Sequence, residues 1–237
     1  MPEQMDHGMG AIQSPPDDRD LIVNQQLAEE LAAAVAPPPD HWLMQSRPPV
    51  RDQTTTPQCV AYSSGAEQAK NDRDEAGRWV DFNEARFFTQ IGGTPAGAFM
   101  RNALQRLKDY GYPEQDATPS PQRHKIGGYY RIEQTRITAK LAIIRNKGIL
   151  AIGPWWPSWL RPVGPEATLP NPGGTPSGHA WWAVGYDRVG VTGQNSWGTA
   201  WGNNGLFRMP WYFFINYMWE FWATTDAKTI AHVRTRQ

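Results

Sequence analysis

A change in sequence pattern near Gly148 constrains the fold of this chain more than any other feature. Before it, segments with helix-start signals or helical spacing predict helices at residues 57–70, 83–89, 95–110 and 138–147. After it, short apolar or alternating segments between turn residues predict strands at residues 149–152, 180–186, 189–194, 206–209 and 220–224. Helices followed by an antiparallel sheet are typical of the α+β class, and we expect a cleft between the two halves.

The chain is predicted to have an N-terminal extension, residues 1–37, followed by one domain, residues 38–237. Residues 1–20 are rich in Pro, Gly, Asp and Gln and are expected to form a mobile tail. Residues 24–36 look helical, and the prolines at 37–39 end that helix. Within the domain we expect a helical lobe at about 38–148 and a β-rich lobe at about 149–237. Residues 154–178 are predicted to be a long surface loop and residues 211–223 buried strands.

Charge and cysteine content exclude some classes of function. The 23 basic and 23 acidic residues cancel, so nothing electrostatic points to nucleic acid or an anionic membrane as a partner. Residues 1–20 lack the apolar core of a signal peptide, and the apolar run 211–223 is too short to cross a bilayer. The 1 cysteine rules out an intrachain disulfide and suits a reducing compartment. We therefore expect a cytoplasmic protein, or a virion-associated one if a bacteriophage encodes it, without a transmembrane segment.

That cysteine, Cys59, is the candidate nucleophile. It falls in the first turn of the helix predicted at residues 57–70, where unpaired N–H groups and the helix dipole favour a thiolate. Its own backbone N–H can face a developing oxyanion. Gln53, in the preceding loop, is the candidate for the second oxyanion donor through its side-chain amide.

His179 and Asn195 are the candidate proton acceptor and the group that orients it. His179 opens one predicted strand and Asn195 closes the next, so neighbouring antiparallel strands bring the two side by side. The Asn195 side-chain oxygen then accepts from one imidazole nitrogen and leaves the other facing the thiol. Trp197 is expected to cover this hydrogen bond and exclude competing water.

The order Gln, Cys, His, Asn and the string NSWG-x-x-WG-x-NG at residues 195–205 resemble the papain family of cysteine peptidases. The resemblance covers about residues 38–225 and implies a two-lobed fold with the active site between the lobes. It also implies a Cys–His–Asn triad and hydrolysis of a peptide or protein substrate through a thioester. No Cys/His cluster has ligand spacing, so neither a metal nor an organic cofactor is expected. The substrate-binding residues implied in the same way are Gly92, Gly93, Gly178 and Trp197.

Several positions depart from that family. Thr55, Thr56, Pro57 and Gln58 replace its usual residues before the nucleophile, and Val60 stands where an aromatic residue is expected. The disulfide cysteines of the family are missing, as in its disulfide-free bacterial or bacteriophage members. The N-terminal extension is also shorter than a typical inhibitory prosegment.

Other interpretations of the same residues remain open. A lone cysteine is most often an inert core residue, Asn195 is a common turn residue, and the pair Gly92–Gly93 is a turn first. The tryptophans at 155, 156 and 159 suit a cleft wall or the core, and His7, His41, His124 and His232 suit solvent or packing positions. Two other functions fit: cleavage of peptidoglycan stem peptides, and a non-catalytic papain-fold component such as a virion protein. Their partners would be peptidoglycan and the virion.

Overall fold

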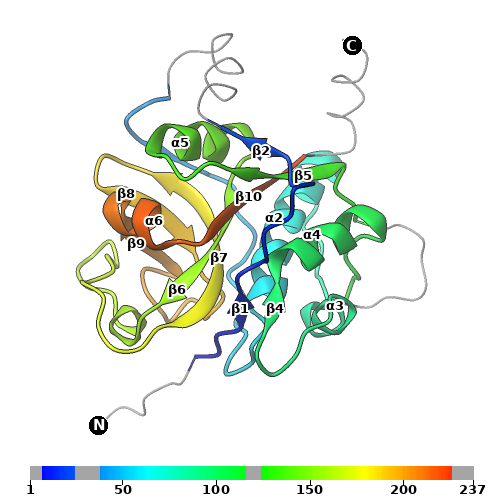
Figure 1. The fold of residues 1–237 in the computed structure, drawn as a ribbon, viewed down its shortest axis with the longest axis horizontal. Coiled ribbons are helices and arrows are strands. Elements are labelled where there is room, and N and C mark those ends of the chain that lie inside the picture. The colour runs from blue at the N-terminus through cyan, green and yellow to red at the C-terminus, as the bar shows by residue number, and fades with distance from the viewer. Residues whose placement is uncertain (1–6, 25–37, 116–123, 226–237) are drawn as a thin grey trace.

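The computed structural model describes residues 7–24, 38–115 and 124–225, and it confirms an α+β fold. The sheet and the helices α2 to α4 lie side by side as two halves of the molecule (Figure 1). The helix predicted at residues 24–36 lies outside the described residues, apart from Asn24.

The helices predicted from the sequence are confirmed, with shifted ends. Their bounds are α2 Cys59–Ala76, α3 Glu84–Gln90, α4 Met100–Asp109 and α5 Arg136–Arg145. Helix α2 continues to Ala76, and Gly77 ends it with the left-handed φ of 76° that glycine adopts without strain. Asn83 caps α3 by accepting from the Arg86 N–H, as its residue type favours. No described helix is long and apolar enough to cross a membrane.

The strands form one large, mostly antiparallel sheet and one small sheet. The large sheet has the order β2-β5-β10-β6-β7-β8-β9, with β3 also paired to β7; β1 pairs with β4. Their bounds are β1 Ala11–Ile12, β2 Ile22–Val23, β3 Trp42–Leu43, β4 Ala98–Phe99, β5 Gly128–Ile132, β6 Ile149–Trp155, β7 Ser177–Tyr186, β8 Gly190–Gln194, β9 Leu206–Pro210 and β10 Glu220–Thr225. β3 and β5 precede Gly148, so the first part of the chain also contributes strands to the sheet.

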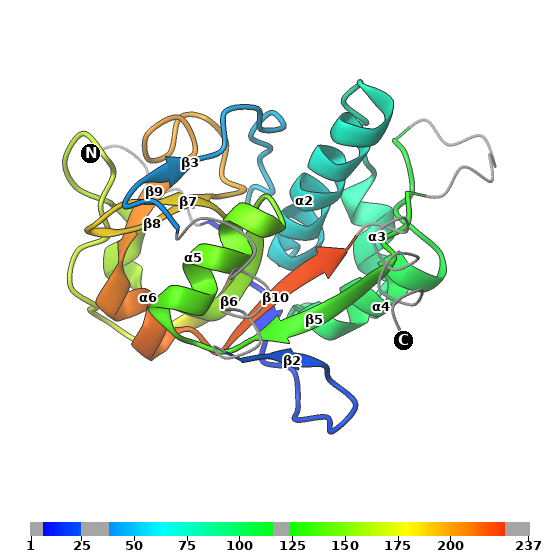
Figure 2. The ribbon, with the colours of Figure 1, turned by 90° about the horizontal axis from the view of Figure 1, so that it is seen from above.

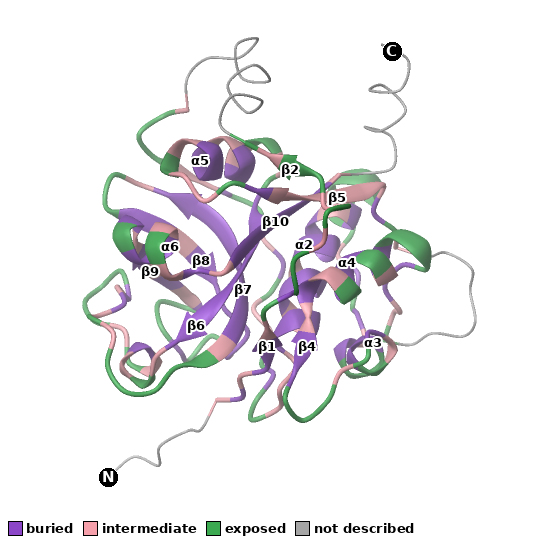
Figure 3. Ribbon diagram, in the orientation of Figure 1, coloured by how far each residue is buried: buried purple, intermediate pink, exposed green. Residues whose placement is uncertain are grey.

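The central strands β6, β7 and β10 are buried along nearly their whole length (Figure 3). On β6, Leu150 and Ile152 belong to the core shared with α2, whereas Ile149 and Ala151 belong to a second core beneath α5 and α6. Because side chains alternate along a strand, burial on both faces requires a continuous apolar run rather than an alternating one. Figure 2 shows α2 between this sheet and helices α3 and α4.

Two segments differ from the sequence-based expectation. Residues 211–217 were expected to be strand but form helix α6, Trp211–Tyr217, which places Phe214 in the second core. Its aromatic residues have strand preference, yet tertiary packing outweighs that preference here. Residues 154–178 were expected to be a surface loop, but the first of them belong to the end of β6 and the last to the start of β7. The segment between these strands contains one 3₁₀ turn, and Trp155 and Trp159 are completely buried.

The N-terminal residues 7–23, which we name the strap, lie against the domain instead of forming a mobile tail. The strap runs between the two halves of the molecule, from β1 beside β4 to β2 beside β5 (Figure 1). Gly8, Gly10 and Ser14 are buried in this contact. The interface between the two halves therefore includes a segment whose composition predicts a solvent-exposed tail.

A buried carboxyl group on α2 gives the fold a pH dependence. Burial raises the pKa of Glu67 to about 8, opposed by a hydrogen bond with Thr224. Between about pH 4.5 and 8 the unfolded chain loses this proton and the folded chain keeps it, so stability falls as the pH rises through that window. We expect Glu67→Gln to remove this loss and to raise the unfolding free energy at pH 8 by up to about 5 kcal/mol.

Urea unfolding at pH 4.5 and pH 8 measures this effect, with Glu75→Gln on the exposed side of the same helix as the control. The Glu67→Gln and wild-type chains should differ little at pH 4.5. An equal difference at both pH values would show that Glu67 is not protonated in the folded chain.

Candidate active site

Cys59 begins helix α2 and lies where that helix meets β7. Its side chain is fully buried, and backbone groups of Gly10 in the strap and of Ala180 in β7 lie against the sulfur. Burial raises the pKa of the thiol to about 11, although these backbone groups favour the thiolate. The covered sulfur is therefore a neutral thiol.

His179 and Asn195 meet across β7 and the end of β8, as their spacing predicts. His179 Nε2 lies 2.8 Å from Asn195 Oδ1, and this oxygen also accepts from the Ser196 N–H at 2.8 Å. The other ring nitrogen, Nδ1, is buried and has no hydrogen-bond partner among the described residues. Burial lowers the pKa of His179 to about 4, with the Asn195 hydrogen bond opposing the change. The bond to Asn195 leaves Nδ1 as the nitrogen available for proton transfer.

The structure places these groups in one region of the interface between the halves. Ala180, whose backbone contacts the Cys59 sulfur, directly follows His179 in β7. Trp155 and Trp197 enclose the imidazole, with ring centroids 4.9 Å and 4.7 Å from it. Trp197 thus lies where it can shield the His179–Asn195 hydrogen bond from water.

Gln53 lies in the same region and is oriented by a hydroxyl group. Ser196 Oγ donates to Gln53 Oε1 at 2.5 Å, and the Gln53 backbone N–H donates to the Ser196 carbonyl at 2.8 Å. With its oxygen fixed in this way, the amide nitrogen donates to the carbonyls of Thr56 and of Gly8, which belongs to the strap. Gln53 therefore already binds a main-chain carbonyl lying across the site.

The strap occupies the region around Cys59 with its main chain. An added Cβ on Gly10 would lie 2.3 Å from the Pro57 oxygen, and one on Gly178 would lie 1.8 Å from the Ala11 oxygen. Both positions need glycine because two backbones approach each other there. At the start of the strap, the His7 ring stacks on Trp197 with centroids 4.5 Å apart. Gly178 and Trp197 therefore contact the segment that fills the site.

The glycine pair Gly92–Gly93 lies in the turn that follows α3. Gly92 has a φ of 76°, and an added Cβ on Gly93 would overlap the Phe88 ring. The strap makes its main-chain pairing instead at Ala98, whose N–H donates to the Gly10 carbonyl at 2.8 Å. A role of the glycine pair in substrate binding remains a prediction.

Sequence reasoning missed the strap and the orienting role of Ser196. The one available signal for the strap was the closely spaced pair Gly8 and Gly10, because glycine is the residue that permits close approach to another backbone. Ser196 stood inside the recognised motif, but its bond to Gln53 depends on a loop far away in sequence. Among the described residues, no group of three or more His, Cys, Asp or Glu side chains is arranged to hold a metal ion.

Comparisons with known proteins give matches only at the level of structure. No family model and no curated protein matches the chain. Xylellain, a cysteine protease from Xylella fastidiosa, superposes with a TM-score of 0.77 at 21% identity, covering 93% of this chain and 97% of that one. ProCathepsin B S9 from Trypanosoma congolense gives 0.71 at 14% identity, with 92% and 85% covered. A Carica candamarcensis cysteine protease in complex with E-64 gives 0.62 at 20% identity, with 79% and 99% covered. The chain therefore has the two-lobed fold of the papain-like cysteine proteases.

Proposed function

We propose that this chain is a papain-like cysteine peptidase and that the strap holds it in a latent form. The observation that carries the proposal is the 2.8 Å contact between His179 and Asn195, made beside a cysteine at the start of a helix. A structural histidine needs neither a cysteine nor an unpaired ring nitrogen next to it. In the described part of the chain the buried Nδ1 has no hydrogen-bond partner, which suits a group that accepts a proton during the reaction.

The proposed reaction is acyl transfer. Cys59 gives its proton to His179 and attacks the carbonyl carbon of the scissile peptide bond. The Cys59 backbone N–H and the Gln53 side-chain amide stabilise the oxyanion that forms. Protonated His179, held in orientation by Asn195, then donates to the leaving amine. Water hydrolyses the resulting thioester with His179 as the base, which restores the free thiol.

The latent form follows from what the strap covers. Its main chain lies over Cys59, and its Gly8 carbonyl accepts from the same Gln53 amide that the reaction requires. Burial also makes the neutral thiol and the neutral imidazole the stable pair over the whole physiological pH range. With Cys59 as the 1 cysteine and hence no disulfide, the chain also suits a bacterial or bacteriophage enzyme working in a reducing compartment.

Labelling with E-64, a thiol-directed epoxide, tests the proposal. The full chain should be labelled slowly, and the chain whose strap has been removed by limited proteolysis should take up one equivalent at Cys59. Peptide hydrolysis should fall in proportion to the label. Hydrolysis that persists after complete labelling of Cys59 would reject this residue as the nucleophile.

Alanine replacements at the two triad partners should differ in size. His179→Ala removes the proton acceptor and should lower kcat by about 10³- to 10⁴-fold. Asn195→Ala removes only an orienting hydrogen bond and should lower kcat by about 10- to 100-fold. Steady-state kinetics after strap removal measure both, with Asn216→Ala at an exposed position of α6 as the control. Negligible effects of both replacements would refute the triad.

A further inference from the structure

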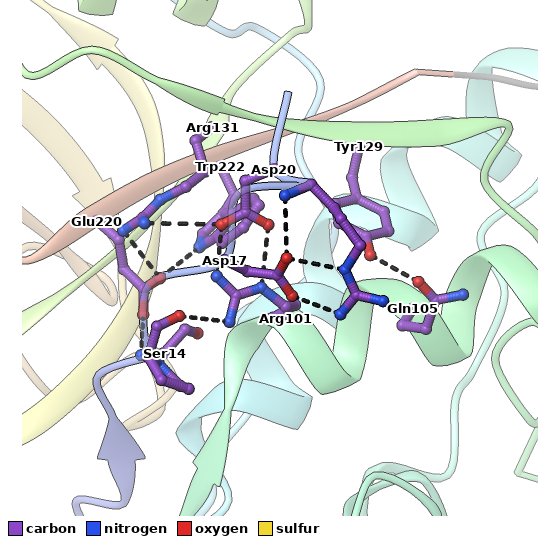
Figure 4. A network of polar contacts seen from close by, with 11 residues as sticks. Ser14, Asp17, Asp20, Arg101, Gln105, Tyr129, Arg131, Glu220 and Trp222 are labelled. Atoms are coloured by element: carbon purple, nitrogen blue, oxygen red, sulfur yellow. Dashed lines mark hydrogen bonds and ion pairs between the residues drawn. The ribbon is translucent and has the colours of Figure 1, made fainter. Parts of the chain in front are cut away.

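The second half of the strap is fixed to the domain by a polar network (Figure 4). The Ser14 N–H donates to Glu220 Oε1 at 2.9 Å. The Asp20 carboxylate accepts from Arg101 at both oxygens, one of them from Nε at 3.0 Å. The side chains of Asp20 and Arg101 are only 6% and 14% exposed. The domain therefore binds a carboxylate of the strap in the paired geometry that arginine favours, largely shielded from water.

Arg101 depends on the strap for all of these contacts. Besides Asp20, its Nη1 donates to the Pro15 carbonyl at 2.7 Å. Within residues 7–24, 38–115 and 124–225, every hydrogen bond and ion pair of the Arg101 side chain goes to the strap. Arg131 lies 3.7 Å from the Asp20 carboxylate but also 3.4 Å from Glu220 of the domain. When the strap leaves, the Arg101 guanidinium therefore loses its hydrogen bonds and its ion pair, whereas Arg131 keeps its ion pair with Glu220.

Both guanidinium groups are supported by the domain itself. They lie over the Trp222 ring at 5.7 Å for Arg101 and 5.2 Å for Arg131, and the Trp222 indole N–H donates to Glu220. These contacts do not involve the strap, so they can hold the arginines in place after it leaves. The remaining set of two guanidinium groups and one carboxylate has a net charge of about +1, which favours an anion in the vacated position.

The network lies within reach of a peptide bound at Cys59. The same strap contacts Cys59 with Gly10 and Glu220 with Ser14, so no more than about 14 Å of extended chain separates the two contacts. Pro15, whose carbonyl accepts from Arg101, is five residues from Gly10, so a substrate that follows the path of the strap would bring a residue about five positions from the cleaved bond to this arginine.

We propose that Arg101 and Arg131 form a subsite for an acidic side chain of the substrate, which Asp20 of the strap fills in the latent chain. This inference rests on the proposed peptidase function and adds a substrate class to it: peptides with Asp or Glu a few residues from the cleaved bond. A substrate carboxylate can accept the same hydrogen bonds from Arg101 as the Asp20 carboxylate does. A substrate amide in that position would leave the charge of the Arg101 guanidinium without a counterion.

The test uses the full chain with two substitutions, Gly10→Val to displace the strap from Cys59 and Asp20→Asn to vacate the arginines. A cleavable peptide is first found by digesting a peptide library, and Glu and Gln are then compared at each position. We expect Glu to raise kcat/KM roughly 30-fold over Gln at one position. Adding Arg101→Gln should bring that ratio to about 1. Arg19→Gln, on the strap and 90% exposed, is the matched control and should not change the ratio.

The outcomes separate the subsite from the peptidase function. Equal cleavage of Glu and Gln peptides at every position overturns the subsite and leaves the peptidase function intact. If no peptide is cleaved and E-64 does not label Cys59, the peptidase function is overturned. Binding of the two peptides to the Gly10→Val, Asp20→Asn chain carrying Cys59→Ala, followed by fluorescence polarisation, then tests the subsite alone. Equal affinities would overturn it.

Discussion

Gly10→Val is expected to raise the rate at which iodoacetamide alkylates Cys59 at pH 7 by at least about 100-fold. The new Cβ would lie 2.3 Å from the Pro57 oxygen, so the strap cannot keep its position over the sulfur. A return of the thiol pKa from about 11 to its ordinary 9.0 alone multiplies the thiolate fraction by about 100. Mass spectrometry of the alkylated chain over time measures the rate.

Leu21→Ala serves as the control for this experiment. Leu21 belongs to the same strap but is 63% exposed, so its replacement should leave the alkylation rate unchanged. Deletion of residues 1–23 should reproduce the increase seen with Gly10→Val. If Gly10→Val and the wild-type chain react at the same rate with identical circular dichroism, the strap does not protect Cys59.

Cys59→Ser, introduced into the Gly10→Val chain, should lower kcat for peptide hydrolysis by at least about 10⁴-fold. A serine hydroxyl ionises far less readily than a thiol, and a pair built to transfer a thiol proton does not activate it. The fold should persist, because the two side chains have nearly the same shape. Hydrolysis of a fluorogenic peptide and thermal unfolding measure the two properties.

Ser63→Ala is the matched control for the nucleophile. Ser63 is buried one turn further along the same helix, and among the described residues its hydroxyl bonds only to the Val60 carbonyl. Its replacement should change kcat by no more than about 2-fold. Retention of more than about 1% of the activity in the Cys59→Ser chain would assign the hydrolysis to another group.

The fold was predictable where burial is complete and the helix signals are local. The runs that form β6 and β7 are apolar because each strand is covered on both faces, and this pattern is visible without coordinates. Helix α6 was not predictable, because its aromatic residues favour strands and its packing against Phe221 of β10 decides the outcome. Strand β5 was missed because most of it is only half-buried and its residues do not alternate.

The candidate site also has a part that could be predicted from the sequence and a part that could not. Cys59, His179 and Asn195 could be selected from their order and from the motif that follows Asn195, because this chemistry constrains residue type. What covers them could not be predicted. The strap is polar and proline-rich, and it binds mainly through its own backbone, which leaves little trace in side-chain composition. Its buried ion pair joins Asp20 to Arg101, two residues far apart in the chain and unremarkable by themselves.

The covalent connection between the strap and the domain makes the proposed inhibition insensitive to dilution. A strap lifted from Cys59 stays attached through residues 24–38, so it competes with substrate at an effective concentration of the order of millimolar. Lowering the protein concentration cannot release it, and a free peptide of the same sequence would need a similar concentration to replace it. Cutting this connection removes the high effective concentration of the strap. A single proteolytic cleavage would therefore activate the proposed peptidase efficiently and irreversibly.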